Sequence, residues 1–237
     1  NQNTTTLAKT AVKKILKKNN LSKVKFIISV TNTPTRVFPS LAHEISSLIS
    51  KSKNFMCMGI NAGCTGYVDA LYLADKLIKK NQDVLIVTAD TYSKYIDIND
   101  KSIRPIFSDG ASCTHLQFRK KNCWKIEKEF FQTESDTLEY LELKKQKINM
   151  NGPEVLSFAI RKVLKTINSL LNKKSNTLIF AHQAGKIVIK NILLKIKKNS
   201  ILPTNYEKNG NLVSTSIPFL IKENFNLLKK NKLILIS

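Results

Sequence analysis

Short, wholly apolar segments alternate with amphipathic helical patterns along this chain, and this alternation constrains the fold more than any other feature. The clearest apolar segment is 84–87, which reads as a strand buried on both faces of a sheet. Residues 4–19 and 67–80 carry apolar side chains at helical spacing. Helices that alternate with buried strands predict an α/β fold, with helices covering a mixed sheet.

The second half of the chain repeats part of this order. A predicted helix, turn and strand occupy residues 4–30, and the same order recurs over 153–181. This repeat suggests an internal duplication, with one half at 1–120 and the other at 121–237. Beyond the repeat, we expect helices over 184–198 and 213–229, before a terminal strand at 233–236.

The chain is strongly basic. Its 237 residues include 39 Lys and Arg against 17 Asp and Glu, which gives a formal net charge of +22. Base composition explains part of this excess, because Lys, Asn and Ile share AT-rich codons. Base composition with solvated lysine faces is the favoured explanation, and attraction to an acidic partner or to phosphate groups is compatible with it. We expect no nucleic-acid partner, because basic residues interleaved with aromatic ones are not evident, and no apolar run approaches the ~18 residues of a membrane span.

Cysteine usage bears on location and on metals. None of the four cysteines forms a CxxC pair, so a structural zinc site is not expected, and we predict that the protein holds no metal. The same usage fits a reducing compartment, and we expect a cytoplasmic protein.

Cys64 lies in the segment Asn-Ala-Gly-Cys-Thr-Gly, at a predicted junction between a strand and a helix. Small residues on both sides permit a sharp turn and a close approach by substrate. A thiol at a helix N-terminus faces the unpaired N–H groups, which predicts a lowered pKa and a reactive thiolate. The alternative is a buried cysteine that acts as a small apolar side chain. The Ala-Gly-Cys-Thr-Gly frame, similar to the Gly-x-Ser-x-Gly nucleophile elbow, favours the nucleophile.

His182 and Asn211 are the other candidates. Of the three histidines, only His182 ends a predicted buried strand just before a helix, where sites of α/β proteins gather. We interpret His43 and His115 as structural or exposed. Asn211 ends an Asn-Gly-Asn segment, which by itself indicates only a turn.

Four motifs occur in one order along the chain: Asn61-Ala62-Gly63-Cys64-Thr65-Gly66-Tyr67, Phe107-Ser108-Asp109-Gly110-Ala111, His182-Gln183-Ala184 and Gly210-Asn211-x-x-Ser214-x-Ser216-Ile217-Pro218. Together they resemble the β-ketoacyl-acyl carrier protein synthase III family of the thiolase superfamily. The resemblance covers nearly the whole chain and implies a five-layered αβαβα thiolase-like fold built from two similar halves. It also implies a Cys-His-Asn triad, and we expect both ends of a longer protein to be missing.

The resemblance implies roles for the triad, with the nucleophile in the first half and the other two members in the second. Cys64 accepts an acyl group from acyl-CoA. Malonyl-acyl carrier protein then loses carbon dioxide, and its enolate attacks the acyl-cysteine. His182 and Asn211 donate N–H groups to the malonyl thioester oxygen. Gly152 is expected to contact the coenzyme A thioester, which is a substrate and not a permanently bound cofactor.

The implied partners are acyl-CoA, acyl carrier protein and a second copy of the chain. We expect strand 84–89 to pair with a strand of that second copy across a two-fold axis. Two other functions stay open. One is an acyltransferase of the same fold that moves an acyl group to an alcohol or amine without decarboxylation. The other is a non-catalytic thiolase-fold subunit that packs against an active partner. Retention of all three triad residues weighs against the second.

Overall fold

The computed structural model describes residues 2–49, 54–121, 123–171, 177–196, 200–230 and 232–237. They form two compact units that interleave along the sequence. The first unit contains residues 1–91 and 109–131, and the second contains 92–108 and 132–237. The predicted halves, 1–120 with the nucleophilic cysteine and 121–237 with the histidine and asparagine, stay a prediction.

The first unit is built on a four-stranded sheet. Its strands are β1 (Val24–Val30), β2 (Met56–Ile60), β3 (Asp83–Asp90) and β4 (Gly110–Gln117), in the spatial order β2-β1-β3-β4. β1 pairs in parallel with β2 and β3, and β4 is antiparallel to β3. The expectation that strand 84–89 pairs across a two-fold axis is wrong, because β1 and β4 already occupy both edges of β3.

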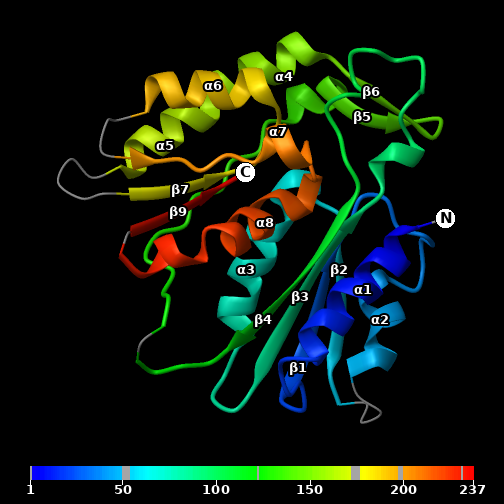
Figure 1. The fold of residues 1–237 in the computed structure, drawn as a ribbon, viewed down its shortest axis with the longest axis vertical. Helices are drawn as coiled ribbons and strands as arrows, with labels where there is room; N and C mark the ends of the chain where they lie inside the picture. The colour runs from blue at the N-terminus through cyan, green and yellow to red at the C-terminus, as the bar shows by residue number, and fades with distance from the viewer. Residues whose placement is uncertain (1, 50–53, 122, 172–176, 197–199, 231) are drawn as a thin grey trace. The chain divides into compact units, whose positions relative to one another are not determined.

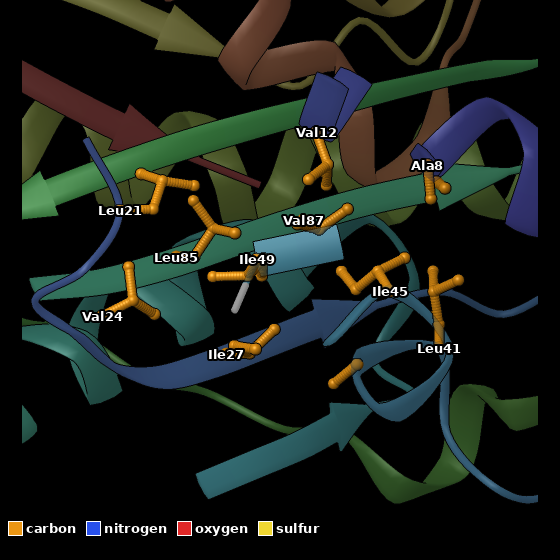
Figure 2. Close-up of a cluster of buried hydrophobic side chains, with 12 residues drawn as sticks. Ala8, Val12, Leu21, Val24, Ile27, Leu41, Ile45, Ile49, Leu85 and Val87 are labelled. Atoms are coloured by element: carbon orange, nitrogen blue, oxygen red, sulfur yellow. The ribbon is translucent and has the colours of Figure 1, made fainter. Parts of the chain in front are cut away.

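Three helices cover the two faces of this sheet (Figure 1). α1 (Thr4–Leu16) and α2 (Leu41–Ile49) lie on one face, and α3 (Gly66–Leu77) lies on the other. Because side chains alternate along a strand, Leu85 and Val87 of β3 pack beneath α1 and α2. Figure 2 shows this cluster, in which Val12, Ile27 and Ile45 meet the same two strand residues.

The second unit contains a three-stranded parallel sheet. Its strands are β7 (Thr177–Ala181), β8 (Ser200–Ile201) and β9 (Lys232–Ile236), in the order β8-β7-β9. α5 (Leu164–Leu170) and α6 (Lys186–Lys195) pack on one face, and α8 (Ser216–Glu223) contacts β7 from the other (Figure 1). α4 (Gly152–Phe158) leads into α5 through a π-helical turn, Ala159–Val163.

The two sheets share one connection plan. In the first unit α1, α2 and α3 precede β1, β2 and β3, and the first strand lies between the other two. In the second unit α5, α6 and α8 precede β7, β8 and β9, with β7 again in the middle. This correspondence supports the internal duplication that the sequence indicated.

Two features differ from the sequence-based expectations. β5 (Leu141–Lys144) and β6 (Lys147–Met150) form a hairpin whose turn residues, Lys145 and Gln146, have φ of 49° and 60°. Such turns usually carry Asn or Gly, so nothing in the sequence pointed to this hairpin. The prediction of one helix over 213–229 is wrong, because the segment is divided into three elements. These are a 3-10 turn at Val213–Thr215, α8 and a second 3-10 segment at Phe225–Lys230.

Candidate active site

The turn that carries Cys64 requires glycine on both sides of it. β2 ends at Ile60, and a 3-10 turn, Gly63–Thr65, leads directly into α3. Gly63 has φ of +54°, a left-handed conformation that side chains disfavour. A Cβ at Gly66 would lie 2.3 Å from Val30 Cγ1, so only glycine lets α3 pack this closely on β1. The small residues around Cys64 are therefore explained by the backbone.

The surroundings of the Cys64 thiol oppose ionisation. Burial raises its pKa to about 12, and the negative charge of Asp90 adds to the increase, whereas a backbone hydrogen bond lowers it. The expected lowering of the pKa by the helix N-terminus is therefore wrong, because desolvation and the carboxylate outweigh it. At neutral pH the sulfur is a thiol, and a base must accept its proton during attack.

Asp90 and Asn32 form a polar network at the end of the sheet that carries Cys64, and sequence reasoning missed both. Asp90 ends β3 and is fully buried. Its carboxylate accepts a hydrogen bond from the Asn32 backbone N–H at 2.9 Å. One signal was available, since Asp90 ends a buried strand whose middle, 84–87, is wholly apolar.

His182 follows the central strand of the second unit, as predicted from its place in the sequence. Its backbone N–H donates to Ile236 O at 2.8 Å, which extends the pairing of β7 with β9 by one residue. Both ring nitrogens are buried and, within the described part of the chain, have no hydrogen-bond partner. Burial lowers the pKa of His182 to about 4, so the imidazole is neutral at pH 7. It can accept one proton and donate another.

The residue after His182 fixes the local backbone. Gln183 is fully buried, and its Nε2 donates to Ala181 O at 2.9 Å. Its Oε1 accepts from the Asn205 backbone N–H at 3.0 Å. The side chain therefore ties the end of β7 to the segment before α7 (Tyr206–Asn209).

Asn211 is buried and is held by its own backbone. Its N–H donates to Ile106 O at 2.8 Å, and its carbonyl accepts from Ser108 N–H at 2.9 Å. Its Oδ1 accepts from the Val213 N–H at 2.8 Å. The Nδ2 group is the donor of this side chain. The Phe-Ser-Asp-Gly motif therefore begins next to Asn211, which sequence order could not indicate.

The other predicted residues divide into two groups. Gly152 is the first residue of α4, after the N-cap Asn151, and a Cβ there would meet nothing within 4 Å among the described residues. Its contact with coenzyme A stays a prediction. His115 is a structural residue, as expected, because its Nε2 lies 2.8 Å from Asp83 Oδ2 in a buried pair. His43 is exposed on α2.

Cys64 belongs to the first unit, and His182 and Asn211 belong to the second. The convergence of the three side chains stays a prediction. No group of three or more His, Cys, Asp or Glu side chains in the described part of the chain could hold a metal ion. Within the same residues, no helix has both the length and the apolarity needed to cross a membrane.

The fold matches solved structures over nearly the whole chain. A 2.1 Å crystal structure of 3-oxoacyl-(acyl-carrier-protein) synthase III aligns with a TM-score of 0.88 at 25% identity, and covers 98% of this chain and 80% of that one. The synthase III from Aquifex aeolicus aligns with a TM-score of 0.85 at 26% identity, over 99% and 80%. Together with the cysteine-bearing turn, these matches define a condensing acyltransferase with a thiolase-like α/β fold, which confirms the predicted fold class.

Sequence comparisons give the family. The pattern of the family described as 3-oxoacyl-[acyl-carrier-protein (ACP)] synthase III matches residues 58–135. The β-ketoacyl-[acyl-carrier-protein] synthase III of Streptococcus agalactiae is 30% identical over 262 aligned residues, which cover 100% of this chain and 81% of that protein. The enzyme of the same name from Clostridium perfringens is 30% identical over 264, with the same coverage. The chain belongs to the β-ketoacyl-[acyl-carrier-protein] synthase III family and is an enzyme of fatty acid biosynthesis.

Proposed function

We propose that this enzyme condenses an acyl-CoA with malonyl-acyl carrier protein through an acyl-Cys64 intermediate. The Cys64 sulfur attacks the thioester carbon of acyl-CoA, the carbon–sulfur bond to coenzyme A breaks, and coenzyme A leaves as its thiol. Because burial and Asp90 hold the Cys64 thiol in its protonated form, a neutral base has to accept the proton as the sulfur attacks.

The buried, neutral imidazole of His182 is the observation that supports this function most. The buried imidazole is neutral at pH 7, and among the described residues neither ring nitrogen has a hydrogen-bond partner. One nitrogen can accept the thiol proton in the first step. In the second step an N–H of the ring can donate to the malonyl thioester oxygen as enolate charge develops there.

Asn211 fits the second step as a fixed donor. Its Oδ1 is engaged by the Val213 N–H, so the Nδ2 group is the part of the side chain that can face a substrate oxygen. Malonyl thioester loses carbon dioxide, and the enolate carbon forms a bond to the acyl carbon. The bond from that carbon to the Cys64 sulfur breaks, and the sulfur recovers a proton as the product leaves.

Several finer assignments accompany this proposal. Coenzyme A enters as a substrate thioester that contacts Gly152, and acyl carrier protein, which is acidic, is attracted by the net charge of +22. The enzyme acts as a homodimer in the cytoplasm, and the absence of disulfides among its four cysteines, all in the described part of the chain, fits a reducing compartment.

Two measurements test the proposal with full-length protein. Labelled acyl-CoA is added, and mass spectrometry locates the acyl group; we expect it on Cys64, and Cys64→Ser should carry none. Malonyl-acyl carrier protein is then added, and carbon dioxide release is followed. Label on Cys64 without carbon dioxide would favour simple acyl transfer to an alcohol or amine. No label at all would favour the non-catalytic subunit.

A further inference from the structure

The loop after β1 is fixed by one carboxylate oxygen. Asp90, fully buried at the end of β3, accepts three hydrogen bonds at Oδ1. The donors are the Asn32 backbone N–H at 2.9 Å, the Thr31 hydroxyl at 3.2 Å and the Thr33 hydroxyl at 3.3 Å. Hydrogen bonds to an ionised acceptor are about twice as strong as neutral ones. The first three residues of the loop are therefore held to β3.

The Asn32 side chain continues this contact to the turn that carries Cys64. Its Nδ2 donates to Asn61 Oδ1 in a short hydrogen bond, just after β2. Its Oδ1 would lie 3.2 Å from a Cβ at residue 63, so the amide packs against Gly63, the residue before Cys64. A continuous path of contacts thus runs from Asp90 through Asn32 to the nucleophile turn.

One atom in this path is costly for the fold. Asn32 Oδ1 is buried, and among the described residues it has no hydrogen-bond partner. An unsatisfied buried acceptor costs about 1–3 kcal/mol. Native proteins contain few such atoms, and one of the accepted reasons for them is a catalytic role nearby.

We propose that Asp90 and Asn32 are positioning residues, which set the place of the Cys64 sulfur for attack on the acyl thioester. The inference rests on the proposed function, because it assigns a purpose to a turn whose cysteine is the nucleophile. The carboxyl ends of the parallel strands β1, β2 and β3 meet at one edge of the sheet. The path joins all three ends, so it couples the turn to the most buried strand of the unit.

Asp90 does not act by activating the thiol. Its negative charge raises the pKa of Cys64 and so disfavours the thiolate. A variant can separate charge from position. Asp90→Asn keeps an oxygen able to accept the three hydrogen bonds but removes the charge, whereas Asp90→Ala removes both. Positioning therefore predicts that Asp90→Asn slows acylation of Cys64 much less than Asp90→Ala does.

The test measures single-turnover acylation of Cys64 by labelled acetyl-CoA in the full-length protein. Asn32→Ala and Asp90→Ala should lower the rate constant by roughly tenfold to a hundredfold, as expected for a reacting atom displaced by ~1 Å. The amplitude should stay near one label per chain. Thr35→Ala is the matched control, because Thr35 lies in the same loop but bonds to Thr5 and not toward Cys64. Its rate constant should equal that of the wild type, and Asp90→Asn should stay within a few-fold of it.

Two results would overturn the inference. A lower amplitude with an unchanged rate constant in Asn32→Ala and Asp90→Ala would show a folding role only. If the wild type takes no label, the proposed function fails, and alkylation of Cys64 by iodoacetamide then decides the positioning role by itself. A loosened turn should expose the sulfur and raise the alkylation rate several-fold in Asn32→Ala over Thr35→Ala, and equal rates would reject the inference.

Discussion

Gly63 and Val213 adopt nearly the same left-handed backbone conformation, with φ of +54° and +51°, each at the first residue of a 3-10 turn that leads into a helix of its own unit. Cys64 follows the first of these residues, and Asn211 lies two positions before the second. A left-handed conformation suits glycine but is strained for a β-branched residue such as valine. Both candidate catalytic turns thus begin with a residue of positive φ.

A substitution can separate the two functions of the Asn211 amide, whose oxygen accepts a hydrogen bond and whose nitrogen can donate one. Asn211→Asp keeps an oxygen for the Val213 N–H, so the strained turn should persist, but it removes the Nδ2 donor. We expect condensation to fall by about 10²–10³-fold, the usual cost of one lost donor to developing negative charge. Acylation of Cys64 should change little. Carbon dioxide release and labelling of Cys64 measure the two steps, and equal losses in both would contradict the assignment.

The packing of Gly66 against β1 predicts a steric penalty. Gly66→Ala would place a Cβ 2.3 Å from Val30 Cγ1, in the interior of the first unit. The backbone must shift to relieve this contact, and we expect a loss of about 1–3 kcal/mol in the free energy of unfolding. Gly152→Ala is the matched control, since no described atom lies within 4 Å of its added Cβ. Urea denaturation of both variants gives the comparison, and similar losses would refute the packing argument.

The buried imidazole of His182 predicts how stability depends on pH. Its pKa falls from an ordinary 6.5 to about 4 in the folded chain, because burial disfavours the charged ring. Between these values the unfolded chain binds a proton that the folded chain does not, so stability falls as pH falls from about 6.5 towards 4. The slope from this group approaches about 1.4 kcal/mol per pH unit.

The variant His182→Gln lacks that contribution. The difference in unfolding free energy between wild type and variant, measured by urea denaturation, should therefore shift against the wild type between pH 7 and pH 5. Acidic residues affect both proteins alike and cancel in the difference. A difference that is independent of pH would mean that His182 titrates normally.

The buried pair of Asp83 and His115 is structural. We expect its removal to lower the free energy of unfolding more than removal of a surface pair does. Asp83 Oδ2 and His115 Nε2 lie 2.8 Å apart, with side chains 5% and 6% exposed. Asp83→Ala leaves a buried ring nitrogen without this partner, and we expect a loss of about 1–3 kcal/mol. Asp97→Ala breaks the exposed pair with Lys147 and should leave stability nearly unchanged. Chemical denaturation of both variants tests this, and equal losses would argue against it.

The raised pKa of Cys64 predicts slow alkylation. Since the pKa is about 12, the rate of reaction with iodoacetamide should rise through pH 9 without reaching a plateau. Mass spectrometry of the Cys64 peptide separates this thiol from exposed Cys123, which serves as the internal reference. If the alkylation rate of Cys64 reached a plateau below pH 8, the pKa of this thiol would be lowered, as the helix N-terminus alone had indicated, and the prediction would be wrong.

The sequence by itself determined the α/β class, the repeated order of helices and strands, and the turn at Cys64. These follow from local periodicity, because a buried strand and an amphipathic helix each have a characteristic spacing of apolar residues along the chain. It also separated His182 from His43 and His115, since only one of them ends a buried strand. The hairpin at β5 and β6 escaped, because its turn residues, Lys145 and Gln146, carry no turn signal.

Only the tertiary structure decided the chemistry of the site. The sequence placed Cys64 at a helix N-terminus and so indicated a low pKa, yet burial and Asp90, which is 26 positions away (90 − 64), reverse the direction. Asn32 and Asn61 meet although 29 positions separate them. The reason is physical: a pKa and a hydrogen-bond network depend on which groups the fold brings together and on how much water it removes, and neither quantity is contained in the neighbouring residues.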